Sequence, residues 1–339
     1  MELQYKKYSP EYKNQVIDLL DNLWHFPYEE KLAYFKWKFE DNPYTDEVLG
    51  FVALDGDRVV SYRGYTVMPI VYKGCTYLSA AVSDMVTHPD YRRKGIFQAL
   101  TNYSIKEVLK DDNYIVSINT SSGGPTVGGY IKLGWKPFSK REHIFRFTFR
   151  GLLNYKLLKK EYDINKDIAT TEGNWRYRLT TENKPSDIAS MGYEYKFISH
   201  KRDEEFYSWR FKNPHNKFLF AYMYDGNNKL LAYMVFAGIS DARFDIVDFN
   251  CENEKYLKKL LGWVCRKAHP FCVSLWTVGK NNYIYNNKLC YGFLVLRPLL
   301  NLLKVRRNPP FVVRYLKGDD GDMYNPYAWD LYKLIGDEI

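Results

Sequence analysis

The chain has 339 residues, 46% of them hydrophobic, and a formal net charge of +9. Its length suffices for about two domains, and its hydrophobic content for a large core, which excludes an intrinsically disordered chain. No apolar run reaches the roughly 18 residues of a membrane span, and the N-terminus lacks the apolar segment of a signal peptide. We therefore expect a cytoplasmic protein without a membrane partner.

Cysteines and histidines give no sign of a metal site. The five cysteines are odd in number and form no C-x-x-C pair, and the six histidines show no ligand spacing. Positive and negative charges alternate along most of the chain, apart from a basic cluster at Lys304–Arg307. A solvated basic face, or attraction of a polyanionic small molecule, is favoured over nucleic-acid binding.

The first 150 residues predict a mixed α/β domain. Hydrophobic periodicity gives a strand, two helices, three strands, a helix, a strand, a helix and further strands. The strands are expected at Leu3–Tyr8, Val48–Leu54, Val59–Val67, Leu78–Val86, Tyr114–Ile118 and Glu142–Phe149, and the helices after Ser9, at Tyr28–Phe39, at Ile96–Leu109 and in the glycine-rich segment after Thr120.

A basic loop containing one glycine joins the strand that ends at Val86 to the helix that begins at Ile96. The first amides of a helix have no partner within it, and the helix dipole places partial positive charge there. Gly95 allows backbone to approach a bulky ligand, and Arg92–Lys94 adds whole charges. The loop thus predicts a phosphate site, with a solvated basic turn as the alternative. Neither a P-loop nor a dinucleotide fingerprint is present.

The segment Arg92-Arg93-Lys94-Gly95-Ile96-Phe97 resembles the Arg/Gln-x-x-Gly-x-Gly/Ala pyrophosphate loop of the GNAT family of N-acetyltransferases. The resemblance implies that acetyl-CoA is a co-substrate and that these residues hold its pyrophosphate. Phe97 departs from the small residue that the family has there. A second segment, Tyr130-x-x-x-Gly134-Trp135, resembles the family's Tyr-x-x-x-Gly-Phe motif.

The sequence also repeats with a period near 170 residues. Trp37–Pro43 returns as Trp209–Pro214, and Asp248 stands where Asp84 stood. The second copy of the loop, Asn250–Lys258, has no glycine and two acids, a composition that disfavours phosphate. We therefore predict α/β architecture with two GNAT-like domains, each a mixed, mostly antiparallel twisted sheet flanked by helices. The expected ranges are a catalytic domain at 1–150, a connection at 151–173 and a degenerate domain at 174–339.

The resemblance also assigns catalytic roles. Backbone amides of Met85, Val86 and Thr87 would contact the thioester and pantetheine, where one oxyanion donor is typically worth about 2.7–4 kcal/mol of barrier. Tyr130 would be the general acid for the leaving thiolate, and Asn119 would bond pantetheine.

Asp84 is the candidate general base. A carboxylate in an apolar run is costly unless it has a partner or a function, and a raised pKa would suit proton abstraction near neutrality. The alternative is a structural carboxylate bonded to its neighbours, which Asp248 at the matching position supports.

These observations favour an N-acetyltransferase that moves an acetyl group from acetyl-CoA to the amine of a small molecule such as an amino sugar. Two alternatives stay open. A Fem-type aminoacyltransferase also pairs two GNAT-like domains, although the Arg92–Phe97 loop and the lack of a coiled-coil arm argue against it. A catalytically inactive GNAT-fold binding protein is the other, because of Phe97. The sequence leaves the acyl chain length and the oligomeric state open.

Overall fold

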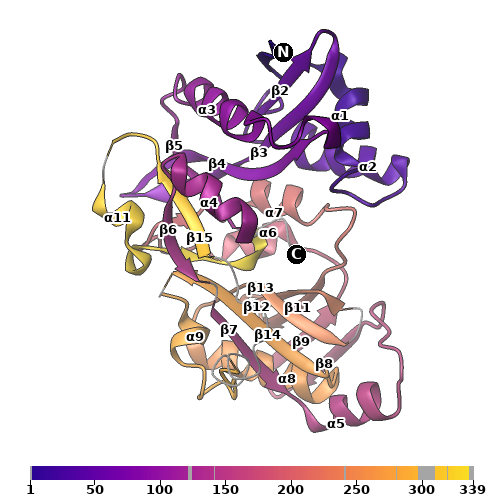
Figure 1. Cartoon of the computed structure of the whole chain (residues 1–339). Coiled ribbons are helices and arrows are strands. Elements are labelled where there is room, and N and C mark those ends of the chain that lie inside the picture. The colour runs from indigo at the N-terminus through magenta and orange to yellow at the C-terminus, as the bar shows by residue number, and fades with distance from the viewer. Residues whose placement is uncertain are drawn as a thin grey trace.

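The computed structural model describes residues 2–120, 124–140, 142–239, 242–279, 281–296, 310–318 and 320–335. The predicted basic cluster at 304–307 lies outside these ranges. Two sheets, each with helices against it, form the upper and lower parts of the molecule in Figure 1. In the described part of the chain, no helix has the length and apolar character needed to cross a membrane.

The first half follows the predicted order of elements. Its strands are β1 (Gln4–Lys7), β2 (Gly50–Asp55), β3 (Arg58–Tyr72), β4 (Cys75–Thr87), β5 (Tyr114–Asn119), β6 (Lys136–Lys140) and β7 (Glu142–Phe147). Its helices are α1 (Lys13–Leu20), α2 (Tyr28–Phe35), α3 (Ile96–Val108) and α4 (Gly124–Lys132). A π-helical turn, Lys36–Glu40, extends α2.

The second half begins with the short helix α5 (Phe149–Gly151). Its strands are β8 (Ile168–Glu172), β9 (Trp175–Thr180), β10 (Ser199–His200), β11 (Leu219–Tyr224), β12 (Leu230–Ala237), β13 (Arg243–Cys251), β14 (Cys272–Gly279), β15 (Pro310–Tyr315) and β16 (Asp330–Leu331). Its helices are α6 (Pro185–Ser190), α7 (Glu204–Arg210), α8 (Glu254–Lys267), α9 (Tyr283–Asn286) and α11 (Gly321–Tyr324). Strand β8 lies within the segment predicted as a connection.

The two sheets share the order and directions of six strands, and the predicted fold class is confirmed. The first has the order β1-β2-β3-β4-β5-β15-β6, with β10 beside β3, and the second runs β8-β9-β11-β12-β13-β14-β16, with β7 also beside β14. Their pairs are antiparallel except for β4 with β5 and β13 with β14, which are parallel. This equivalence is the structural form of the sequence repeat.

Each half lends a strand to the other. Strand β15 pairs with β5 in the first sheet, and β7 pairs with β14 in the second. An arginine of each exchanged strand donates a hydrogen bond to the equivalent turn of the half that the strand joins: Arg314 to the Leu133 carbonyl at 2.6 Å, and Arg146 to the Tyr291 carbonyl at 2.9 Å. A boundary at residue 150 therefore does not separate the two sheets, because β7 precedes this residue and pairs with β14 of the second sheet.

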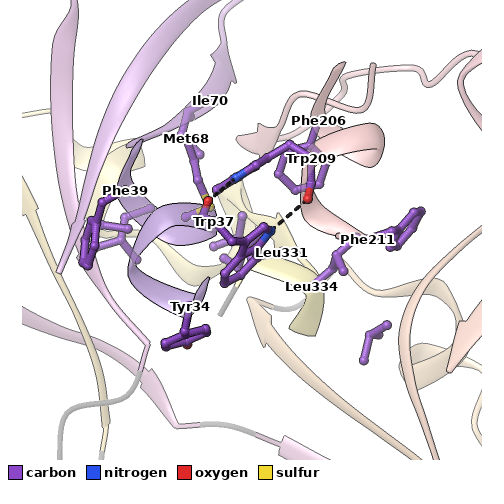
Figure 2. Close-up of a cluster of buried hydrophobic side chains, with 14 of the residues drawn as sticks. Tyr34, Trp37, Phe39, Met68, Ile70, Phe206, Trp209, Phe211, Leu331 and Leu334 are labelled. Atoms are coloured by element: carbon purple, nitrogen blue, oxygen red, sulfur yellow. Dashed lines mark hydrogen bonds between the residues drawn. The ribbon is translucent and has the colours of Figure 1, made fainter. Parts of the chain in front are cut away.

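A reciprocal tryptophan pair joins the halves (Figure 2). The Trp37 indole N–H donates to the Trp209 carbonyl at 2.9 Å, and the Trp209 N–H donates to the Trp37 carbonyl at 2.8 Å. The two rings stack with centroids 5.7 Å apart and belong to one buried cluster that takes residues from both halves. The repeated Trp-x-Phe of the sequence is thus the contact between the two copies.

We expect Trp37→Phe and Trp209→Phe each to lower the free energy of unfolding by about 1–3 kcal/mol, because each leaves a buried carbonyl without its donor. Urea unfolding of each variant measures this loss. Trp175→Phe, at a half-buried position outside this contact, is the control. Equal losses in all three variants would contradict a special role for the pair.

Strand β10 adds a second contact between the halves, where His200 pairs in register with Ile70 of β3. The His200 side chain is fully buried, and neither ring nitrogen bonds to any residue that the structure describes. Burial lowers the pKa of His200 well below 6.5, and the nearby charges of Arg202 and Arg210 lower it further. His200 is therefore neutral in the folded protein near neutral pH.

This burial predicts a loss of stability in mild acid. Below pH 6.5, the ordinary pKa, the unfolded chain binds a proton at His200 that the folded protein does not bind. The free energy of unfolding should therefore fall by about 1.4 kcal/mol per pH unit from this residue as the pH drops below that value. Chemical denaturation between pH 7 and 5 should show a shallower slope of stability against pH for His200→Phe than for wild type, and equal slopes would contradict this prediction.

Candidate active site

The predicted phosphate loop lies between β4 and α3. Gly95 precedes the helix with φ +75° and ψ 3°, in the left-handed region, and no side chain caps the helix. A Cβ at Gly95 would meet no atom within 4 Å, so backbone conformation, and not crowding, requires glycine there. Arg92, Arg93 and Lys94 are exposed around this uncapped end. The loop therefore presents free amides and three cations together.

Strand β4 extends well past the end of its pairing with β5. Strands β4 and β5 pair from Leu78 to the register pair Ala81–Ile118, but β4 continues to Thr87. On its other side β4 stays paired with β3, so that Met85 lies opposite Arg63. Backbone of Met85, Val86 and Thr87 on the β5 side thus lies outside the ladder between these strands, and its contact with a ligand stays a prediction.

A β-bulge precedes this segment. The register between β3 and β4 shifts between Arg63 and Tyr65, so Ser83 and Asp84 together oppose Gly64. A Cβ at Gly64 would lie 2.8 Å from the Phe39 ring, which explains the glycine in this long buried strand. Bulges re-aim side chains, and Asp84 here meets Trp24 of the α1–α2 loop and Lys38 of the π-helical turn.

Asp84 lies in a polar cluster that the sequence did not predict. Its carboxylate accepts a hydrogen bond from the Trp24 indole at 3.0 Å and forms an ion pair with Lys38 at 2.8 Å. The side chain of Lys38 is 1% exposed and that of Asp84 is 12% exposed. Rings of Trp24, Tyr34 and Phe39 surround the ammonium at 5.3–5.8 Å. These three aromatic residues therefore enclose the ion pair.

The second half repeats this arrangement at Asp248. That carboxylate is fully buried and accepts hydrogen bonds from Tyr207 at 2.9 Å and Tyr233 at 2.8 Å, with Arg202 at 3.1 Å. Burial raises the pKa of Asp248. A carboxylate beside a buried cation is therefore common to both halves, so the pairing alone does not distinguish a catalytic from a structural role. The general-base role of Asp84 stays a prediction.

Tyr130 and Phe97, from separate motifs, meet in the structure. Their ring centroids are 5.3 Å apart in an edge-to-face arrangement, and Trp135 contacts Tyr130 from another side at 5.4 Å. A Cβ at Gly129 would lie 2.7 Å from the Phe97 ring. The large residue at the last loop position is therefore accommodated by the glycine beside Tyr130, and the two motifs form one packed unit.

Two further residues complete the description of the site. The Tyr130 hydroxyl accepts a 2.6 Å hydrogen bond from Arg63, a residue that the sequence did not single out. Asn119 is buried at the end of β5 and lies in register with Val312 of β15. Arg63 and Lys38 were missed because a cation in a strand or helix ordinarily indicates solvent. A usable signal existed for Lys38, since both sequence copies place a cation between Trp and Phe, at Lys38 and Arg210.

The second half lacks the features of the loop. Helix α8, the counterpart of α3, is capped by Asn253, whose side chain accepts from the Lys255 amide at 3.0 Å. Glu252 and Glu254 flank this cap. A helix end that already satisfies its own amide next to two carboxylates is unsuited to an anion. Of these two equivalent loops, only the one at Gly95 is therefore a candidate anion site.

Comparisons with known proteins agree with this geometry. Residues 4–138 match the family model described as "Acetyltransferase (GNAT) domain". A probable N-acyltransferase from Enterococcus faecalis V583 is 14% identical, with a TM-score of 0.65 over 94% of this chain and 73% of that one. A GCN5-related N-acetyltransferase from Anabaena variabilis is 13% identical, with a TM-score of 0.64 over 93% of this chain and 73% of that one.

A tandem GNAT protein from the clavulanic acid biosynthesis pathway is 12% identical, with a TM-score of 0.51 over 94% of this chain and 100% of that one. At such identities the likeness shows the fold alone. No curated protein matches the sequence.

Asp84→Asn should lower the free energy of unfolding by about 3–5 kcal/mol, because it leaves the buried Lys38 ammonium without its carboxylate. Lys38→Met in the same chain should restore most of this loss, since the unpaired charge is then gone. Urea unfolding of the single and double variants measures both effects. A double variant no more stable than Asp84→Asn would show that the ion pair does not account for the loss.

Proposed function

We propose that this protein is an acyl-CoA-dependent N-acyltransferase. The match of residues 4–138 to the GNAT acetyltransferase domain, which confirms the predicted family, supports this proposal. Its donor is acetyl-CoA, and its acceptor is the amine of a small molecule such as an amino sugar, in the cytoplasm. One observation carries the proposal. The α3 N-terminus is uncapped, follows a left-handed glycine and is surrounded by exposed cations, whereas its counterpart α8 is closed by Asn253.

Each part of the site has a task in this reaction. The loop Arg92–Phe97 binds the pyrophosphate of the donor through amides and charge. Backbone N–H groups at the end of β4, from Met85 to Thr87, polarise the thioester carbonyl, and Asn119 bonds the pantetheine arm. Asp84 accepts the proton of the attacking amine, and Tyr130 gives a proton to the departing sulfur.

The family resemblance supports a small amine as the acceptor. The partly exposed Asp84 carboxylate lies beside the Trp24 indole, and the Lys38 ammonium already offsets its charge. Its task in the proposal is therefore to take a proton from a neutral amine and not to bind the acceptor by charge. A panel of amines tests the amino-sugar assignment, and a panel of acyl donors tests the length of the acyl chain.

Acetyl-CoA should stabilise wild type but not Gly95→Glu. A ligand at about 100 times its Kd adds about 2.7 kcal/mol of stability, several degrees in a thermal melt. Gly74→Glu is the matched control, because Gly74 also has a positive φ (+78°) and open space around its Cβ position, yet lies at the β3–β4 turn away from the loop. It should carry the same backbone strain and charge and keep the shift.

The outcomes separate the candidate functions. A shift lost only in Gly95→Glu, followed by thiol release with one member of an amine panel, supports the enzyme. Thiol release with longer acyl donors and not with acetyl-CoA would correct the acyl group. Binding without thiol release would indicate the inactive binding protein, and salt-sensitive tRNA binding without an acetyl-CoA shift would indicate the aminoacyl-tRNA-dependent enzyme.

The stabilised double variant then tests Asp84. If Lys38→Met with Asp84→Asn restores stability but lowers kcat by about 10²-fold or more, Asp84 acts as the base. If the double variant restores both the stability and kcat, the Asp84 carboxylate is structural.

A further inference from the structure

Arg63 is a buried cation that forms no ion pair within the described part of the chain. Its side chain is fully buried on β3, and its Nη1 donates to the Tyr130 hydroxyl at 2.6 Å. Its Nε and Nη2 have no hydrogen-bond partner among the described residues. The guanidinium carbon lies 4.9 Å from the Tyr65 ring and 5.2 Å from the Tyr130 ring.

Such a residue is costly for the fold, because a buried charge without a counter-charge loses its hydration. The second half shows that the fold does not require it. In the first half, Arg63 of β3 lies opposite Met85, the residue after Asp84. In the second half, Met234 of β12 lies opposite Phe249, the residue after Asp248. Met234 is fully buried. A methionine therefore fills this position in a sheet of the same topology.

The partner of Arg63 has changed as well. The turn Ile131–Trp135 is matched by Leu289–Phe293, with Trp135 bonding back to the Tyr130 carbonyl and Phe293 to the Lys288 carbonyl. Lys288 thus occupies the position of Tyr130. The arginine and the tyrosine occur together in the half that has the phosphate loop, and both are absent from the half that lacks it. This pattern connects Arg63 with the chemistry of the first half.

We propose that Arg63 is a positioning residue for Tyr130, and this inference rests on the proposed function. Arginine has no acceptor, so the Tyr130 oxygen must accept in this hydrogen bond, and its own O–H remains available to donate. Phe97 and Trp135 hold the ring from two other sides. Arg63 thus fixes the ring and directs the phenolic proton outward.

The charge of Arg63 matters during the transfer itself. The amine nitrogen forms the C–N bond and loses one proton to the base, while the C–S bond breaks with its electron pair on sulfur. The sulfur takes the Tyr130 proton, which leaves a phenolate against the guanidinium. The nearby cation stabilises this anion in a site with little water, until solvent returns a proton to the oxygen.

The test combines Arg63→Met, Arg63→Lys and Tyr130→Phe with the double variant Arg63→Met/Tyr130→Phe. Methionine is the residue that the second half uses at this position, so the fold should accept it, and thermal melts check this. Thiol release is measured with the amine from the panel, or with water as acceptor if none reacts. Exposed Arg243→Met, in the second half, controls for loss of an arginine.

Arg63→Met should lower kcat roughly 10- to 100-fold, a part of the 10²- to 10⁴-fold typical of general acid–base catalysis, and leave the acetyl-CoA melting shift and KM unchanged. In the Tyr130→Phe background, Arg63→Met should change kcat less than about 2-fold, because the phenolic proton that Arg63 directs is already absent. Arg63→Lys should lie between, since a lysine keeps the charge but not the planar fork.

Three results would overturn the inference. The first is an unchanged kcat in Arg63→Met. The second is a double variant whose loss of kcat equals the product of the losses in Arg63→Met and Tyr130→Phe. The third is an effect of Arg63→Met on acetyl-CoA binding alone. In each of these wild type still binds and reacts, so the proposed function stands. If wild type neither binds acetyl-CoA nor releases thiol, the proposed function fails, and the role of Arg63 fails with it.

Discussion

The paired indoles of Trp37 and Trp209 fix how the two halves meet, and the site depends on that contact. Each indole donates to the backbone carbonyl of the other, so neither helix end can shift without losing two hydrogen bonds. Lys38 directly follows Trp37 in the same π-helical turn. The contact therefore sets the position of the ammonium that pairs with Asp84, and through it the arrangement at the bulge of β4.

The second half contributes structure to the first half. It has lost the glycine loop, the tyrosine and the buried arginine, yet it supplies β15, which lies between β5 and β6 of the first sheet. Arg314 of β15 holds the turn after α4, the helix that carries Tyr130. The degenerate half is consequently part of the scaffold of the candidate site and not an appended module.

Much of this could be predicted from local sequence pattern. Periodicity located the strands and helices of the first half, and a glycine before a helix with adjacent cations located the phosphate loop, because these features depend on neighbours in the chain. The exchange of β7 and β15 could not be predicted, since an alternating strand fits either of two equivalent sheets. Arg63 and Lys38 could not be assigned either. A charged residue reveals its burial only when distant rings and carboxylates are placed around it.

The exchanged strands also bear on how the protein is made. During synthesis β5 emerges long before β15 (Pro310–Tyr315), the strand that pairs with its edge. Until then β5 keeps an unpaired edge, which can pair with other chains. The half with the phosphate loop therefore cannot reach its final form on the ribosome ahead of the other half. Folding of the two halves is coupled, slow steps are expected from such distant pairing, and a nascent chain stays exposed to aggregation until β15 has been released.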